Sequence, residues 1–376
     1  MVKTKQEKET FVSELLFHYD SQIPETHHLP PCPSLRDRLW AVSPTNIDSP
    51  FYNYVGQDHA KLKMGRAIAI ALEKPNHVCR DISWLLTGPS SVGKTTLSRV
   101  FAKTLGLPLI EISPQAVSTV HELLECIVSF LNACEPKIKV EDVAGRIKLP
   151  PCIVFIDEVH NLKNNMQQGL LKALESQDAI MCTEKGKIVD TYNVCWIAAT
   201  TDCADLFDAF QNRFCEVKLK PYCKEEVAEI VKVHNPDFTF SMCQLIANYQ
   251  PRVPRKALEF ARDLKMLQKI QVNQDFGELA AQIAAESGID EFGLHEMHVR
   301  ILKILAKRPT SKDRLAMQLQ VRTKELDTRI MPTLLMETPD QQALVGVSMS
   351  GYLLTEAGYQ ELKKRNLEEP KPYYIF

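Results

Sequence analysis

The chain has 376 residues, which is long for one domain and predicts two or three. Hydrophobic residues make up 45% and charged residues 24%, yet no apolar run approaches the ~18 residues of a membrane helix, and the first residues lack the apolar stretch of a secretory signal. The net charge of −2 excludes a surface that is basic throughout. The 11 cysteines are scattered without a CxxC pair, which is typical of reduced thiols in a cytoplasmic protein.

The first half of the chain alternates apolar strands with helices. Residues 1–50 are rich in proline and predict an extension with at most a short helix at 11–18. Four apolar segments then predict buried strands at 82–88, 107–113, 152–158 and 194–201. Between and before them, helical patterns occupy 58–73, 95–105, 117–133 and 166–176. Buried strands that alternate with helices predict an α/β fold, a parallel sheet covered on both faces.

The second half has a different pattern. After Pro221 only helical patterns remain until about residue 285, which predicts an all-helical domain. Residues 295–362 contain three helical patterns and then an alternating segment that turns at Gly351, the order of a winged helix. The basic run 363–365 is predicted to be a solvated helix end. The predicted boundaries are 1–50 for the extension, 51–220 for the α/β domain, 221–293 for the helical lid, 294–366 for the winged helix and 367–376 for a tail.

A phosphate-binding loop follows the first strand. Residues 88–95 fit the pattern G-x-x-x-x-G-K-[ST] without a mismatch, between a strand and a helix as the pattern requires. In such a loop backbone N–H groups cradle phosphates, Lys94 lies on the β/γ-phosphates, and the Thr95 hydroxyl binds Mg²⁺. The predicted nucleotide contacts are Gly88, Pro89, Ser90, Ser91, Val92, Gly93, Lys94, Thr95 and Thr96.

Carboxylates and hydroxyls end two later strands. Asp157 follows the apolar strand of "IVFIDEVH" and is a second candidate for the Mg²⁺ shell, and the next residue, Glu158, is a candidate to polarise the attacking water. Thr201, the second threonine of "IAATT", is the stronger candidate to sense the γ-phosphate. His160 would complete a DExH helicase signature, but a structural role is the favoured interpretation.

Two arginines are candidates for contact with the phosphates. Arg213 lies between a helix and an apolar run, where it could reach the nucleotide of a neighbouring subunit. Arg255 follows Pro254 at the start of a helix that could bring it over the nucleotide of its own chain.

The order of these motifs resembles that of AAA+ P-loop ATPases, and in detail the RuvB family of bacterial Holliday-junction branch-migration motors. The resemblance covers about residues 54–362 and rests on "YVGQDHAK", "GPSSVGKTTLS", "VFIDEVHNL", "RFCEV" and "VPRKAL". It implies ATP and Mg²⁺ as cofactors, a homo-oligomer in the form of a hexameric ring, and action on duplex or junction DNA. It also implies that Tyr54, Val55 and Gly56 lie near the adenine.

The chain departs from that family upstream of Tyr54, where it has an unusual extension in place of a basic stretch, and at three places after it. The segment 132–150 is longer, the hairpin 181–192 is shorter, and Asp202 stands where the family has an arginine after the two threonines. Because the hairpin engages the junction-binding partner in that family, both segments are candidate docking sites for a protein partner. No contact with a membrane is expected.

DNA contacts are predicted late in the chain. Residues 295–376 hold 13 Lys and Arg against 10 Asp and Glu. Within them Arg322, Lys324 and Arg329 are predicted on the second helix of a helix-turn-helix and are the candidates for phosphate contact, although Glu325 and Asp327 interleave with them.

Three functions remain open on the sequence. The first is an ATP-driven ring motor on duplex or branched DNA. The second is an ATP-dependent assembly switch or loader that acts on a protein partner in recombination, replication or transposition. The third, an inactive structural homologue, is disfavoured because the motif residues from Lys94 to Arg213 are intact.

Overall fold

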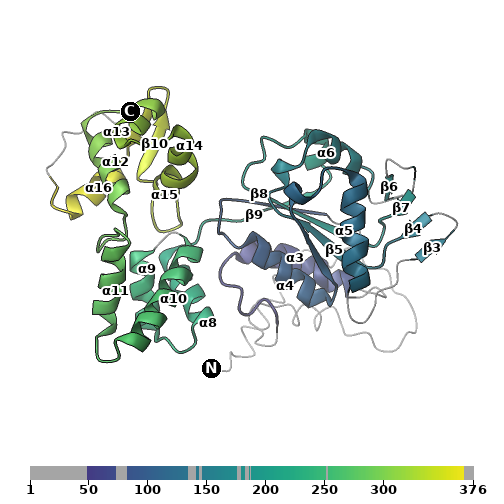
Figure 1. Ribbon diagram of the computed structural model, residues 1–376, viewed down its shortest axis with the longest axis horizontal. Helices are drawn as coiled ribbons and strands as arrows, with labels where there is room; N and C mark the ends of the chain where they lie inside the picture. Colours follow the sequence, from purple (N-terminus) through teal and green to yellow (C-terminus); the bar gives the residue numbers. More distant parts are fainter. Residues whose placement is uncertain are drawn as a thin grey trace, which may run out of the picture. The chain divides into compact units, whose positions relative to one another are not determined.

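The computed structural model divides the chain into two compact units, Met1–Leu219 and Lys220–Phe376, which are described separately (Figure 1). The residues that the structure describes are 49–72, 83–133, 141–143, 146–175, 179–182, 186, 188–250 and 253–367. The predicted helix at 11–18 and nearly all of the predicted extension and tail lie outside them. Among the described residues, no helix is long and apolar enough to cross a membrane.

A five-stranded parallel sheet forms the centre of the first unit, as predicted. Its order is β2-β5-β8-β1-β9, and every neighbouring pair is parallel. The strands are β1 (Trp84–Thr87), β2 (Leu109–Ile112), β5 (Cys152–Ile156), β8 (Val194–Thr200) and β9 (Cys215–Lys218). The edge strand β9 lies in the short apolar run after Arg213, which the sequence alone had not identified as a strand.

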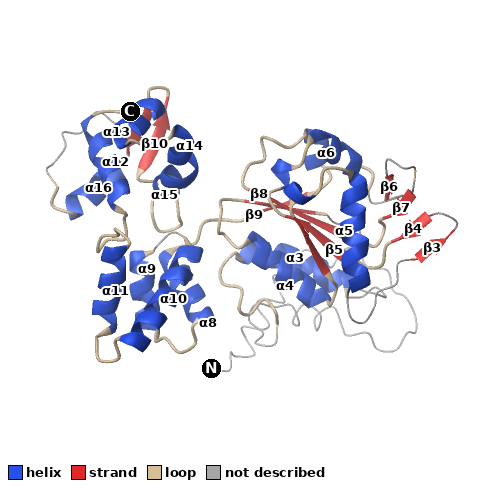
Figure 2. Cartoon of the chain, in the orientation of Figure 1, coloured by secondary structure: helices blue, strands red, loops and turns tan. Residues whose placement is uncertain are grey.

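Helices cover both faces of this sheet (Figure 2). The helices α3 (Asp58–Ala71) and α4 (Lys94–Leu105) share one apolar core with Trp84 and Leu86 of β1. The helices α5 (Val120–Ala133) and α6 (Asn164–Leu170) share the other core with Leu85. Successive strand residues therefore enter opposite cores, because side chains alternate across a strand.

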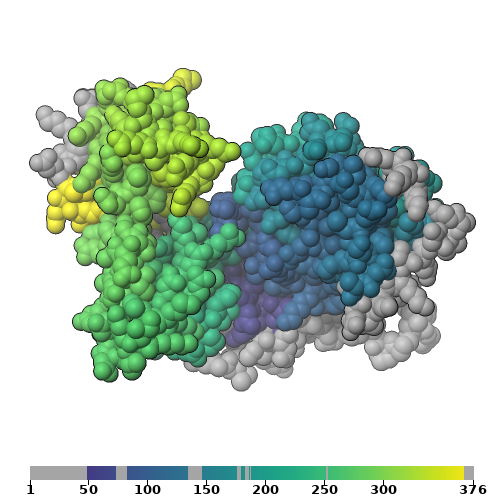
Figure 3. All heavy atoms as spheres, viewed as in Figure 1, coloured from purple at the N-terminus to yellow at the C-terminus, as the bar shows by residue number. Residues whose placement is uncertain are grey.

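Two of the predicted helices differ in length from the structure. The helix α5 begins three residues later than predicted, and α6 ends at Leu170, so that the predicted end of this helix forms a turn. The helix α5 forms part of the surface of the first unit (Figure 3). One of its residues, Phe130, is 41% exposed. The short helices η2 (Pro114–Ala116), η3 (Val159–Asn161) and α7 (Asp208–Gln211) lie in the connections.

A second, smaller sheet joins the two segments in which the chain departs from the resembled family. Its order is β3-β4-β7-β6, with β4 and β7 parallel. The strands are β3 (Glu141–Val143), β4 (Arg146–Lys148), β6 (Ile180–Cys182) and β7 (Ile188–Asp190). Met181 and Val189 are buried in the α5–α6 core, whereas Ile188 is 42% exposed. The insertion and the hairpin are therefore one structural feature, not two.

The second unit begins with four helices, in agreement with the predicted helical region. They are α8 (Lys224–His234), α9 (Phe240–Tyr249), α10 (Pro254–Ile270) and α11 (Phe276–Glu286). Each contributes fully buried apolar residues such as Val227, Ile246 and Leu264. An amphipathic stripe on each helix is buried against its neighbours.

The rest of the second unit has the order of elements predicted for a winged helix. The helices are α12 (Glu296–Lys307), α13 (Lys312–Leu319), α14 (Thr323–Glu325), the π-helical turn η4 (Leu326–Ile330) and α15 (Met331–Leu335). An antiparallel hairpin of β10 (Val345–Ser348) and β11 (Gly351–Leu354) precedes α16 (Glu356–Lys364). A Cβ at Gly351 would lie 2.4 Å from the Thr310 carbonyl oxygen, so this close approach requires glycine.

Arg365 fixes the last helix to the segment before α12. Its guanidinium donates to both oxygens of Asp290, at 2.6 and 3.2 Å, and to Glu361 Oε2 at 2.7 Å. The side chain is only 6% exposed, so the predicted solvated run is wrong at this residue. Burial alone would raise the pKa of Asp290 and of Glu361, but hydrogen bonds, those from Arg365 among them, hold both values below the ordinary range.

The substitution Arg365→Gln is expected to destabilise the second unit by about 2 kcal/mol, because two partly buried carboxylates lose a charged donor. A carboxylate whose pKa is lowered by folding stabilises the protein above its unfolded pKa, and this contribution is lost as the pH falls through the folded pKa. The wild type should therefore lose stability more steeply than the variant as the pH falls below about 4. Chemical denaturation from pH 7 to pH 3 measures both effects. Lys363→Gln, an exposed neutralisation on the same helix, is the control and should change neither.

Candidate functional site

Three neighbouring strands bring the predicted catalytic groups to one edge of the sheet. Because β5, β8 and β1 are adjacent and parallel, their carboxyl ends lie at the same edge. The phosphate loop follows β1, Asp157 and Glu158 follow β5, and Thr201 follows β8. Crevices at the carboxyl ends of parallel strands are where α/β proteins bind ligands.

The phosphate loop contains backbone conformations that residues with a side chain rarely adopt. Gly88, Ser91 and Gly93 have φ values of 140°, 64° and 90°. A Cβ at Gly88 would lie 2.4 Å from the Leu219 carbonyl oxygen, so glycine is required there by sterics as well as by φ. Ser90 and Thr96, two of the other predicted contacts, are exposed.

Lys94 is held inside the loop. Its ammonium donates to the carbonyl oxygens of Gly88 and Pro89, both at 2.8 Å, and the residue is buried. Burial lowers the pKa of Lys94, while the nearby carboxylates of Glu158 and Asp157 oppose that shift. Among the described residues, the direct partners of this ammonium are carbonyl dipoles, so the site suits a phosphate group, which would supply full negative charge.

Thr95 and Asp157 meet beside the loop. The Thr95 hydroxyl is 3.3 Å from Asp157 Oδ2, although the two residues lie on different elements. A hydroxyl and a carboxylate are hard oxygen ligands, and Mg²⁺ is usually held by one or two such groups together with substrate phosphates. The donor set therefore fits Mg²⁺. Among the described residues, no group of three or more His, Cys, Asp or Glu side chains could hold a metal by itself.

Glu158 and Thr201 are in direct contact. The Thr201 hydroxyl donates to Glu158 Oε2 at 3.1 Å, and the carboxylate is 40% exposed. Glu158 has a left-handed backbone with a φ of 48°, a conformation that costs energy in any residue other than glycine. Backbone strain of this kind is common at functional sites, where a side chain must be held in one direction.

Tyr54 contacts the phosphate loop. It is buried, and its hydroxyl donates to the Gly93 carbonyl oxygen at 3.2 Å. Val55 and Gly56 follow it at half-buried positions. The expected contact of these residues with adenine stays a prediction.

Of the two candidate arginines, Arg213 lies away from this edge and Arg255 belongs to the second unit. The N–H of Cys215 donates to the Ser83 carbonyl oxygen at 2.7 Å, so Arg213 lies near the amino end of β1, about 10 Å along the strand from its carboxyl end. Its guanidinium pairs with Glu175 at 3.3 Å, and both side chains are more than a third exposed. Arg255 is exposed in the first turn of α10, in the second unit.

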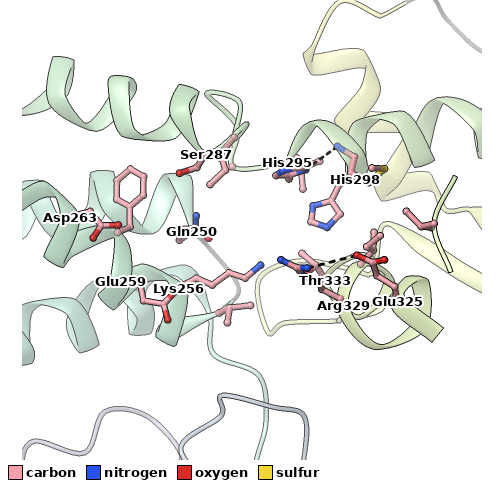
Figure 4. A pocket seen from close by; sticks show the side chains of 18 residues that line it. Gln250, Lys256, Glu259, Asp263, Ser287, His295, His298, Glu325, Arg329 and Thr333 are labelled. Carbon is pink, nitrogen blue, oxygen red and sulfur yellow. Dashed lines mark hydrogen bonds and ion pairs between the residues drawn. The ribbon is translucent and has the colours of Figure 1, made fainter. Parts of the chain in front are cut away.

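The three predicted DNA-binding residues lie on consecutive helical segments of the second unit and are all exposed. Arg322 and Lys324 are exposed at the start of α14. Arg329 also lines a pocket of about 400 Å³ together with Lys256 of α10, and it pairs with Glu325 at 3.8 Å (Figure 4). Glu259 and Asp263 also line this pocket, so its charge is mixed.

One contact at the sheet edge was missed by the analysis of the sequence. The His160 ring lies 2.9 Å from the hydroxyl of the buried Thr200, the residue before Thr201. The "DEVH" motif was the signal for His160. Only the fold, however, shows that the His160 side chain lies at the end of the neighbouring strand β8.

Comparisons with known proteins agree with this geometry. The family model described as "ATPase family associated with various cellular activities (AAA)" matches residues 84–222. The "Holliday junction branch migration complex subunit RuvB" of Parasynechococcus marenigrum is 26% identical over 84% of this chain and 88% of its own length. The protein of the same name from Pseudothermotoga lettingae is 27% identical over 82% and 87%.

Solved structures show the same fold. The structure titled Thermotoga maritima RuvB Holliday junction branch migration motor aligns with a TM-score of 0.62 and 22% identity, covering 82% of this chain and 95% of its own. A variant of that protein aligns with a TM-score of 0.64 over 84% of this chain and 97% of its own. Residues 84–222 thus match the AAA ATPase family, and over about four-fifths of its length the chain resembles the bacterial RuvB proteins.

Proposed function

We propose that this chain is an ATP-driven motor that acts as a ring-shaped oligomer on duplex or branched DNA. The observation that carries the proposal is the meeting of Lys94, Asp157 and Glu158 at one edge of the sheet, in a chain whose named relatives are subunits of a branch-migration complex. Those relatives favour a DNA motor over the loader that acts on a protein.

ATP and Mg²⁺ would bind at this edge. Lys94 and the loop N–H groups would hold the phosphates, and Thr95 with Asp157 would hold the Mg²⁺, which neutralises phosphate charge when bound. Glu158 would polarise the attacking water, and Thr201 would respond to the γ-phosphate through its contact with Glu158. Tyr54 would lie near the adenine and would support the phosphate loop through its hydrogen bond to the Gly93 carbonyl oxygen.

The active site would be shared between subunits. The position of Arg213 near the amino end of β1 supports a role at the nucleotide of a neighbour, because its own phosphate loop is at the other end of that strand. Exposed ion pairs contribute at most about 1 kcal/mol, so Glu175 would release Arg213 at little cost. Arg255 would reach the nucleotide of its own chain from the lid. A ring of six subunits stays a prediction.

DNA would bind to the last part of the second unit. The three helical segments, the hairpin β10–β11 and α16 support the proposed winged-helix domain at 294–366, after a helical lid at 221–293. Arg322, Lys324 and Arg329 are all exposed, which supports phosphate contact by each of them, although Arg329 also lies beside Glu325 and lines the pocket with Lys256.

The small sheet β3-β4-β7-β6 is the proposed docking surface for a protein partner. Its outer face includes the exposed Ile188 and Arg146, which is 53% exposed. The relatives are named as subunits of a complex, which supports a partner for this chain. A cytoplasmic location stays a prediction from the sequence.

ATP turnover without DNA, with duplex DNA and with a four-way junction tests the proposal. We expect stimulation by DNA, strongest with the junction. Arg213→Ala should lower the stimulated turnover by about 10³-fold, because an arginine that reaches the transition state in trans is worth that much or more. Arg146→Ala, which breaks another exposed ion pair of the first unit, should leave turnover unchanged. Turnover that needs Arg213 but ignores every DNA would contradict the motor and favour the loader.

Neutralising Arg322 and Lys324 together with glutamine should weaken duplex binding equally for unrelated sequences. If both contact phosphates, the slope of log affinity against log salt should become shallower by roughly 2, since each contact releases about one counterion. Fluorescence anisotropy at several salt concentrations measures the slope. The matched control neutralises the exposed Lys269 and Lys363. Equal slopes in the two double variants would remove Arg322 and Lys324 from the DNA interface.

A further inference from the structure

His160 connects the loop after β5 to the end of β8. It lies in the short helix η3, which begins directly after Glu158, and its side chain is 18% exposed. Its Nδ1 is 2.9 Å from Thr200 Oγ1. Thr200 is the last residue of β8 and is fully buried, so it offers a fixed anchor.

The direction of this hydrogen bond follows from the other bonds of Thr200. Its hydroxyl donates its single hydrogen to the Asp202 carbonyl oxygen at 2.6 Å and accepts from the Asp202 N–H at 3.0 Å. No hydrogen remains for His160. The imidazole must therefore be protonated at Nδ1 and donate to Thr200.

The same imidazole nitrogen lies beside the catalytic carboxylate. His160 Nδ1 is 3.4 Å from Glu158 Oε2, the oxygen that also accepts from the Thr201 hydroxyl. Because the single Nδ1 hydrogen is donated to Thr200, His160 lies against this oxygen without donating to it, and the Thr201 hydroxyl is the donor that restrains Oε2. Within the described part of the chain, no hydrogen bond reaches Oε1, so this oxygen is available to a water molecule.

We propose that His160 is a positioning residue for ATP hydrolysis. It ties the loop after β5 to Thr200 and holds Glu158 in its left-handed backbone conformation, so that Oε2 is restrained while Oε1 receives the proton of the attacking water. The inference rests on the proposed role of Glu158 as the base. It does not depend on DNA or on a change in the charge of His160.

The substitutions His160→Leu and His160→Asn separate the hydrogen bond from simple packing. Leucine fills the space without a donor. Asparagine keeps an N–H at the position of Nδ1, because Nδ2 of asparagine and Nδ1 of histidine are both bonded to Cγ. We expect His160→Leu to lower kcat for ATP, measured without DNA, by about 10- to 100-fold, the effect of a misplaced catalytic group. His160→Asn should recover most of that loss. KM and the binding of a fluorescent ATP analogue should not change in either variant.

Two further variants complete the test. Thr200→Val should lower kcat at least as much as His160→Leu, since it also removes the two bonds to Asp202, and adding His160→Leu to it should lower kcat no further, because the bond between the two side chains is already lost. His121→Ala removes a histidine of similar exposure, 21%, from α5 and should have wild-type kcat. Thermal unfolding identifies any variant that is not folded.

Three results would overturn the inference: wild-type kcat in His160→Leu, equal losses in the Leu and Asn variants, or a loss that appears in KM and ATP binding. Glu158→Gln tests the base separately. If that variant keeps wild-type turnover, the proposed role of Glu158 fails, whatever the His160 variants do. A protein that hydrolyses ATP without responding to DNA would refute the motor and leave the test of His160 intact.

Discussion

The parallel direction of β5, β8 and β1 is the constraint on which the first unit depends. It places the ends of three separate chain segments at one edge of the sheet, where Lys94, Glu158 and Thr201 meet. The same direction places Arg213, which comes just before the outermost strand β9, near the amino ends of the strands, opposite the carboxyl ends where the other groups meet. One geometric fact therefore accounts for the grouping of these side chains and for the separation of Arg213 from them, which supports the proposed role of Arg213 at the site of a neighbour.

The polar groups at this edge are held in place by the backbone and by buried hydroxyls. The carbonyl groups of the phosphate loop position Lys94, and Thr200 anchors His160. Glu158 adopts a strained backbone, which the surrounding bonds must stabilise. Such preorganisation reduces the movement needed when charge develops on the phosphates, and so it favours catalysis.

Much of this arrangement was predictable because its signals are local. Apolar strands ending in Asp157 or Thr201, and a glycine-rich loop before Lys94, are patterns within a few residues. The remaining features depend on contacts between distant segments. The three-residue strands β4 and β7 are too short to show a period, and Arg365 finds its partner Asp290 75 residues away. His160 could not be assigned because its role requires the backbone at Glu158 and the end of β8.

The central claim is that one ATP site is built from two subunits, and complementation between two inactive variants tests it most directly. Glu158→Gln subunits lack the base but keep Arg213, whereas Arg213→Ala subunits keep the base. If the arginine acts in trans, mixing the two should restore turnover, because some interfaces then combine an intact Glu158 with an intact Arg213. A mixture that oligomerises but is no more active than its components would contradict a shared active site.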